Sequence, residues 1–166
     1  MRAPFRERDA ELDEGDIVEG VRLPTWSKQG VLSDTPRRVL VTSNGCDCED
    51  FMRARDSGKS DAAAKLRIHV APLREPAGSE LKLQQIRDGE VLPLFWVYGD
   101  ERIPDQILDL SKETSVPAAL VVAGRHLATI AEWQWRRLLV HLAVERWHAK
   151  PEKIFRPELL REGETE

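Results

Sequence analysis

The chain contains little that would crosslink it or anchor it in a membrane. Its 166 residues include only two cysteines, Cys46 and Cys48, and no apolar run approaches the ~20 residues needed to span a bilayer. The N-terminus also lacks the apolar core of a signal peptide. We therefore expect a cytoplasmic protein with reduced thiols and no membrane partner.

Glycine-rich phosphate loops are absent as well, because neither the G-x-G-x-x-G nor the Walker-type spacing occurs. This argues against a doubly wound nucleotide-binding fold. An excess of positive charge is also lacking: 25 Lys and Arg against 29 Asp and Glu give a formal net charge of −4. General nucleic-acid binders cluster basic residues on one face, so only a local basic patch is compatible with that function.

What the chain does contain is enough apolar material for one core. Apolar residues make up 41% of the sequence and include five tryptophans, which predicts a single domain. The charged, irregular ends predict a flexible N-terminal segment over residues 1–14 and a charged tail over residues 150–166. The folded unit is therefore expected at residues 15–149.

Short apolar and β-branched runs, bounded by Gly, Pro or Asp, predict strands within this unit. Six such runs occur, at residues 15–22, 38–42, 66–73, 94–98, 106–110 and 118–123. The intervening polar segments are interpreted as a long loop at residues 23–36 and as insertions at residues 48–65 and 75–89, with a weak helical pattern in the last.

The clearest predicted element is the last one. Thr129 and Glu132 have the spacing of a capping box, and a broad apolar stripe follows from Trp135 to Trp147. We expect a helix over residues 130–148. Strands followed by one final helix predict a mainly β fold, a small and strongly bent β-barrel of five to seven strands with the C-terminal helix packed against it.

The order of several short motifs resembles that of the MazF/PemK family of toxins over roughly residues 15–145. The motifs are Gly15-Asp-Ile-Val18, Arg37-Arg-Val-Leu-Val-Thr-Ser43, Ile68-His-Val-Ala-Pro-Leu73 and Leu108-Asp-Leu-Ser-Lys-Glu-Thr-Ser-Val116. The resemblance implies an SH3-like β-barrel, usually a homodimer, that cuts single-stranded RNA without a metal ion or other cofactor. It also implies a toxin–antitoxin pair, in which a protein partner inhibits the nuclease.

The resemblance also points to candidate catalytic residues. Nucleases of the family carry a basic residue just before the second strand, which Arg37 or Arg38 matches. They also carry a Thr or Ser shortly after the proline of the third strand. At that place Pro72 is followed by Leu73 and Arg74, so the hydroxyl is absent. This departure leaves the source of the acid–base chemistry open.

RNA cleavage without a metal needs a base, an acid and positive charge for the developing phosphorane. Arg37, Arg38 and Arg74 supply positive charge and would converge on one phosphate if their strands are neighbours. His69 is the nearest candidate base, because alternation along its strand turns it away from the core. Solvated loop arginines and a merely exposed histidine remain the alternatives.

The segment Ser43-Asn-Gly45 favours a turn that ends the preceding strand sharply. Two sulfurs do not make up a structural zinc site, and the acidic residues around Asp47 disfavour a thiolate. We expect neither a metal site nor a nucleophilic cysteine here. One cysteine should pack as a small apolar residue, and the Asp47 carboxylate should accept hydrogen bonds from backbone amides of the turn.

Trp133, Arg136 and Arg137 lie at the start of the predicted helix, partly off its apolar face. Tryptophan and arginine are enriched at interaction hot spots, so these residues are candidates for binding a protein partner or a stacked base. A tryptophan that fixes the helix start on the barrel is the alternative. Two functions follow: a MazF-like endoribonuclease, and a non-catalytic SH3-like barrel that binds a protein or ligand.

Overall fold

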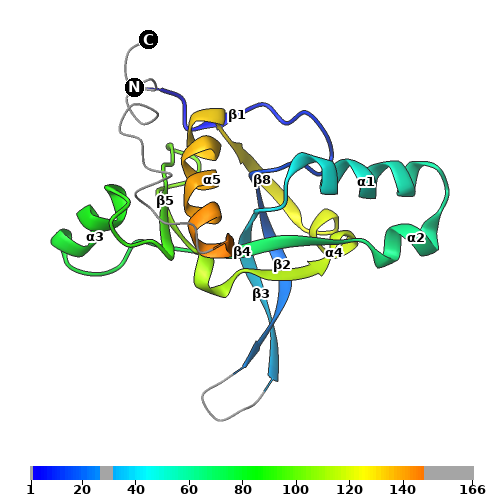
Figure 1. Ribbon diagram of the computed structural model, residues 1–166, viewed down its shortest axis with the longest axis horizontal. Helices are drawn as coiled ribbons and strands as arrows, with labels where there is room; N and C mark the ends of the chain where they lie inside the picture. The colour runs from blue at the N-terminus through cyan, green and yellow to red at the C-terminus, as the bar shows by residue number, and fades with distance from the viewer. Residues whose placement is uncertain (1, 27–31, 148–166) are drawn as a thin grey trace.

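The computed structural model describes residues 2–26 and 32–147 and is mainly β (Figure 1). The strands in these ranges are β1 (Phe5–Arg6), β2 (Asp16–Trp26), β3 (Leu32–Val41), β4 (Arg67–Arg74), β5 (Leu94–Val97), β6 (Gln106–Asp109), β7 (Thr114–Pro117) and β8 (Arg125–Ile130). The helices are α1 (Gly45–Asp56), α2 (Ser60–Lys65), α3 (Glu80–Arg87), α4 (Ala118–Val122) and α5 (Glu132–Trp147), with a 3₁₀ turn, η1 (Leu110–Lys112).

The strands form one antiparallel sheet that curls strongly into a half-barrel (Figure 1). Its order is β1-β8-β2-β3-β4-β6-β5, and β7 pairs with β4 beside this path. The predicted mainly β class and the C-terminal helix are confirmed, whereas the eight strands in the described ranges exceed the five to seven expected. No helix in these ranges is both long and apolar enough to cross a membrane.

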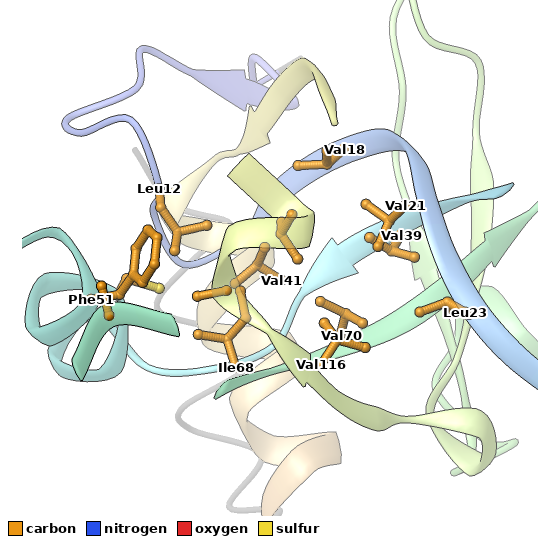
Figure 2. Packing of buried hydrophobic residues seen from close by; sticks show 14 residues of the cluster. Leu12, Val18, Val21, Leu23, Val39, Val41, Phe51, Ile68, Val70 and Val116 are labelled. Atoms are coloured by element: carbon orange, nitrogen blue, oxygen red, sulfur yellow. The ribbon is translucent and has the colours of Figure 1, made fainter. Parts of the chain in front are cut away.

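The central strands β2, β3 and β4 contribute buried side chains to both faces of the sheet. On β3, for example, Val39 and Val41 face one core cluster and Leu40 faces the other. The first cluster, here called the α1-side core, lies beneath α1, α2 and α4, and Figure 2 shows its packing. The second, the α5-side core, lies beneath α5, which contributes Trp135 and Leu138.

The long hairpin of β2 and β3 extends beyond its neighbours (Figure 1). β2 pairs with β8 only as far as Glu19, and β3 pairs with β4 only from Val39 onward, so the outer strands pair only with each other. The long loop expected at residues 23–36 is therefore wrong for the described part. Pro24 lies opposite Asp34 in this outer part of β2, where β8 no longer pairs with the other side of the strand, and such edge positions tolerate proline.

The chain after β3 enters a helix directly, where an irregular polar segment was expected. Asn44 is the N-cap of α1, and its side-chain oxygen accepts the backbone N–H of Asp47 at 3.0 Å. The capping side chain is thus Asn44, and the role expected of the Asp47 carboxylate was assigned to the wrong residue. Cys48 is buried in the α1-side core beside Phe51, which confirms the apolar packing expected of one cysteine.

Residues 118–123 form the helix α4, and their expectation as a strand is wrong. A short apolar run does not distinguish a strand from a buried helical turn, and here Ala118 and Val121 face the core at helical spacing. The sheet continues instead with β8, which the sequence analysis missed. The insertion at residues 75–89 does contain the helix that its weak pattern indicated, α3.

Thr129 is not a helix cap, and the predicted capping box is wrong. It is a residue of β8, and its hydroxyl donates to the buried carboxylate of Asp16 at 2.6 Å. α5 begins after Ala131, whose carbonyl accepts the first helical N–H groups, from Gln134 and Trp135. The helix itself, Glu132–Trp147, lies where the apolar stripe predicted it.

The N-terminal segment belongs to the folded unit, although residues 1–14 were expected to be flexible. β1 pairs with β8, and Leu12 is buried in the α1-side core. The Arg8 guanidinium lies 2.8 Å from the carboxylate of Asp16, a fully buried side chain. Sequence patterns missed this packing because the segment has too few apolar residues to show a period. The expected tail, residues 150–166, lies outside the described residues.

His141 is buried between α5 and β5. Its Nδ1 donates to the carbonyl oxygen of Leu92 at 3.3 Å, and its ring meets that of Phe95 edge-on at 5.2 Å between centroids. Burial lowers the pKa of His141, the hydrogen bond to Leu92 opposes this, and the charge of Arg137 lowers the pKa further. The folded protein therefore holds this imidazole neutral.

The α1-side core can be tested with a pair of alanine variants. Ile68 is fully buried there, so Ile68→Ala should lower the free energy of unfolding in urea by about 2–5 kcal/mol. Leu81→Ala is the matched control, because Leu81 on α3 is 73% exposed and its loss should change the value by less than about 0.5 kcal/mol. Equal effects of the two variants would contradict the placement of Ile68.

His141 gives the stability a dependence on pH. Because its folded pKa lies below the ordinary value near 6.5, the unfolded state takes up a proton that the folded state refuses. The free energy of unfolding should therefore fall as the pH drops below about 6.5 toward the lowered pKa. His141→Gln should lose this part of the slope in urea unfolding between about pH 7 and pH 5. Parallel pH profiles for the two proteins would show that His141 is not held neutral.

Candidate functional site

The predicted arginines do not all meet at one place. Arg37 and Arg38 are consecutive on β3, so Arg37 lies on the side of Val39 and Arg38 on the opposite side. Nη2 of Arg38 donates to the Glu19 carboxylate at 3.0 Å, and Arg125 pairs with the same carboxylate. Arg38 is therefore engaged within the sheet, while Arg37 is exposed.

Arg37 and Arg74 lie just beyond one end of the β3–β4 pairing. This pairing runs from Val41 opposite Val70 to Val39 opposite Pro72 and stops two residues short of Arg37 and Arg74. Both side chains are exposed. Alternation along the two strands puts both on the α1 side of the sheet, and we call these two residues the basic pair.

His69 lies apart from this pair. It is exposed on β4, and its side chain shares the α5 side of the sheet with Ala71 and Leu73. Arg74 alternates to the other side, so His69 and the basic pair are separated by the sheet itself. The predicted catalytic set thus divides between two faces, and His69 has other polar neighbours.

These neighbours come from the strands on both sides of β4. The His69 carbonyl oxygen accepts the backbone N–H of Thr42 at 2.9 Å, and His69 pairs with Ser115 on β7. Glu113 comes two residues before Ser115, just before β7 begins at Thr114. Its carboxylate accepts the Thr42 hydroxyl from the β3 side of β4, so the Glu113 side chain reaches across β4.

Thr42, Glu113 and Arg146 form a hydrogen-bonded cluster beside His69. Nε of Arg146 donates to Oε2 of Glu113 at 2.9 Å, and Nη2 donates to Oε1 at 2.5 Å. The Thr42 hydroxyl also donates to Oε1 of Glu113. Nη2 reaches the carbonyl oxygen of Thr42 as well, at 3.1 Å. The last turn of α5 is thereby fixed on the ends of β3 and β7.

A second arginine lies on the other side of His69. Arg67, two residues earlier on β4, is exposed, and its Nε donates to the Ser115 hydroxyl at 3.2 Å. Its Nη2 donates to the carbonyl of Ser115. We call the group of polar residues around His69 the His69 patch; its members are Thr42, Arg67, His69, Glu113, Ser115 and Arg146.

The His69 patch holds the groups that general acid–base chemistry on a phosphate ester needs. An imidazole and a carboxylate can transfer protons, and two guanidinium groups can bind phosphate oxygens with paired N–H groups. The Glu113 side chain is 13% exposed and that of Arg146 is 28% exposed, so both reach the surface only in part. The patch is therefore partly shielded from water, which strengthens electrostatic interactions within it.

Neither cysteine belongs to this patch. Cys46 and Cys48 lie on α1, one exposed and the other buried, so the two thiols point to different surroundings. Burial raises the pKa of Cys48 to about 12, and the nearby Asp13 and Asp16 add to the effect. Cys48 is thus a neutral thiol near pH 7. Within residues 2–26 and 32–147 there is no group of three or more His, Cys, Asp or Glu that could hold a metal ion.

The three residues predicted to bind a partner make contacts within the chain. Trp133 donates its indole N–H to the Ala3 carbonyl at 3.0 Å and packs on Tyr98 at 5.4 Å between ring centroids. Arg137 lies over Tyr98, and Arg136 pairs with Glu132 within α5. Trp133 thus connects the start of α5 to the N-terminal segment, which agrees with the alternative that this tryptophan fixes the helix on the barrel. Binding of a partner by these residues stays a prediction.

A cavity of about 770 Å³ lies between the N-terminal segment and α1, away from the His69 patch. Most of its charged lining residues are acidic, namely Asp9, Asp13, Glu14, Glu49, Asp56 and Glu132. Carboxylates repel phosphate groups, and only Arg6 and Arg53 oppose them. This cavity is therefore unsuited to RNA.

Sequence reasoning found His69 but missed the residues that surround it. Thr42 and Glu113 occur within two of the family-like motifs, and Arg146 falls within the predicted helix. No spacing rule connects them, because they come from β3, the turn before β7 and the end of α5. The usable signal was Lys112-Glu-Thr-Ser115, a short polar run between two buried segments.

Comparison with known proteins adds no assignment. No protein-family model matches the chain, and no curated protein matches it.

The cluster beside His69 can be tested through stability. Arg146→Gln removes the cation that pairs with the partly buried Glu113 and should lower the free energy of unfolding by about 1–3 kcal/mol. Arg136→Gln changes the same residue type on the same helix, but its pair with Glu132 is exposed, so the stability should hardly change. Chemical unfolding at pH 7 measures both. If the two variants lose the same amount, Arg146 does not anchor α5.

Proposed function

We propose that this half-barrel cleaves single-stranded RNA without a metal ion and that the reaction takes place at the His69 patch. The observation that carries the proposal is a set of contacts around Thr42: its backbone N–H donates to the carbonyl of exposed His69, and its hydroxyl donates to the Glu113 carboxylate, which also pairs with Arg146. These are the three kinds of group that the chemistry requires. The motif resemblance to MazF/PemK toxins supports RNA as the substrate.

The reaction uses the 2′-hydroxyl of the RNA as its nucleophile. The Glu113 carboxylate accepts the 2′-hydroxyl proton as the bond from O2′ to phosphorus forms, and protonated His69 donates a proton to O5′ as the bond from phosphorus to O5′ breaks. The products are a 2′,3′-cyclic phosphate and a free 5′-hydroxyl. DNA lacks the 2′-hydroxyl and is therefore not cleaved by this route.

Arg146 and Arg67 supply the positive charge. They lie on opposite sides of His69, Arg146 through its bonds to Glu113 and Arg67 through its bond to the Ser115 hydroxyl. As the 2′-oxygen adds to the phosphodiester, one further negative charge develops on the phosphorane oxygens, so guanidinium groups there lower the barrier. The protein's net charge of −4 makes such a local concentration of arginine necessary for RNA binding.

A second candidate function is a non-catalytic module that binds a protein partner. The alternating aromatic and basic side chains that connect α3, β5 and the start of α5 favour it: Arg87 lies over Trp96 at 4.3 Å, and Arg137 lies over Tyr98 at 5.7 Å. Tyr98 in turn contacts Trp133. Such rows suit interaction hot spots because aromatic and arginine side chains offer large contact areas.

The nuclease proposal is tested with defined single-stranded RNA in EDTA. We expect cleavage by the wild-type protein and a loss in kcat of about 10²-fold or more for His69→Ala and for Glu113→Gln, because each removes a proton-transfer group. Arg38→Ala is the control, since Arg38 faces Glu19 away from the patch and its loss should leave kcat unchanged.

The same assay distinguishes the other sites. If Arg37→Ala abolishes cleavage while Glu113→Gln does not, the reaction belongs to the Arg37–Arg74 pair. If the wild-type protein cuts no RNA, the binding module replaces the nuclease, and the proposal fails. Melting temperatures of all variants should be recorded alongside, so that unfolding is not mistaken for lost chemistry.

A further inference from the structure

We infer that Arg146 is a phosphate-operated latch on Glu113: it occupies the carboxylate in the free protein, and a phosphate group of the incoming substrate draws it away. This inference rests on the proposed function, because it concerns the regulation of the same patch. It adds that binding of a phosphate itself frees the carboxylate that the proposed reaction uses as its base.

The geometry of the free protein carries the first half of the inference. Both oxygens of Glu113 accept hydrogen bonds from Arg146, at 2.9 Å to Oε2 and 2.5 Å to Oε1. Oε1 also accepts the hydroxyl proton of Thr42. Oε1 therefore accepts two hydrogen bonds and Oε2 accepts one, so a substrate hydroxyl has to compete with Arg146 for Oε2 while Arg146 is in place.

The exposure of the pair allows this movement. The Arg146 side chain is 28% exposed and the Glu113 side chain 13% exposed, so a dissolved anion can approach the guanidinium. A phosphate group offers the guanidinium the same paired hydrogen bonds that the Glu113 carboxylate offers, so one anion can replace the other. By contrast, Arg8 holds Asp16 in a pair whose carboxylate is fully buried and out of reach of phosphate.

The neighbours of Arg146 determine how far it moves. Nη2 also donates to the carbonyl oxygen of Thr42 at 3.1 Å, so the guanidinium can turn toward the surface while it stays attached to the end of β3. Its planar, forked N–H groups match a phosphate as well as they match a carboxylate. The Thr42 hydroxyl remains on Oε1 and holds Glu113 in position, which leaves Oε2 for the 2′-hydroxyl.

Charge makes the exchange selective for phosphate groups. Arg67 stands on the far side of His69, so an anion at the patch meets two guanidinium groups. Among the charged side chains of residues 2–26 and 32–147, Arg146 alone pairs with Glu113. A phosphodiester carries one negative charge and inorganic phosphate carries more, and both present several acceptor oxygens. Inorganic phosphate is thus a sufficient probe, and no RNA is required.

The test is a titration of the full chain with inorganic phosphate, followed by NMR. In the wild-type protein, the Arg146 Nε–Hε signal and the Glu113 carboxyl carbon signal should shift together as phosphate binds. The carboxyl carbon of Glu19, which pairs with Arg38 and Arg125 elsewhere on the sheet, should not shift. This measurement needs no variant and does not depend on cleavage.

Two matched variants complete the experiment. Glu113→Gln removes the competing carboxylate and should raise the affinity of the His69 patch for inorganic phosphate by about fivefold. Glu19→Gln also removes a carboxylate that pairs with arginines and lowers the negative charge equally, and it should leave that affinity unchanged. The latch is overturned if phosphate leaves the Glu113 signal in place, or if the two variants raise the affinity equally.

These outcomes separate the latch from the nuclease. A failed phosphate titration in a protein that still cuts RNA overturns the latch and leaves the proposed function intact. A successful titration in a protein that cuts no RNA confirms the anion exchange and rejects the nuclease.

Discussion

The structure depends on three central strands that are covered on both faces. Because successive residues of a strand point to opposite sides, β4 sends Ile68 and Val70 into the α1-side core, and Ala71 and Leu73 into the α5-side core. The polar residues of β4, namely Arg67, His69 and Arg74, lie outside both core clusters. His69 comes two residues before Ala71, where the α5-side core begins on this strand.

The end of α5 brings Arg146 to the edge of the α5-side core. The helix covers the α5-side core with Trp135, Leu138 and Leu142, and Arg146 is the next residue on that side, one turn later. At this position the guanidinium closes the core by satisfying Glu113 and the buried Thr42. The contact of Arg146 therefore fixes the end of α5 on the sheet and also occupies the Glu113 carboxylate.

Local sequence patterns were sufficient to predict an element wherever its apolar residues recur with a clear period. The strand at residues 66–73, the apolar stripe of α5 and the packing of one cysteine were all predictable for that reason. The outer hairpin was not, because Pro24 reads as a loop residue unless its edge position is known. α4 and β8 failed because short apolar runs do not specify their period.

The candidate site could be predicted only in part, for a different reason. His69 follows from alternation within one strand, and Arg37 with Arg74 follows from matching strand ends. Glu113 and Arg146 are 33 residues apart and meet only because α5 folds back over the sheet. Contacts of this kind depend on the angle between a helix and a sheet, which no local pattern encodes.

The pairing of β1 with β8 has a consequence for how the protein is made. Phe5 is synthesised about 125 residues before its partner Ile130. At ordinary rates of translation this delay is roughly 6–25 s. During that time Phe5 and Arg6 have no β8 edge to join, so β1 is among the last strands of the sheet to pair. Until β8 has been synthesised, the backbone groups of β1 have no native partner, and they must be kept from pairing with other strands in the cell.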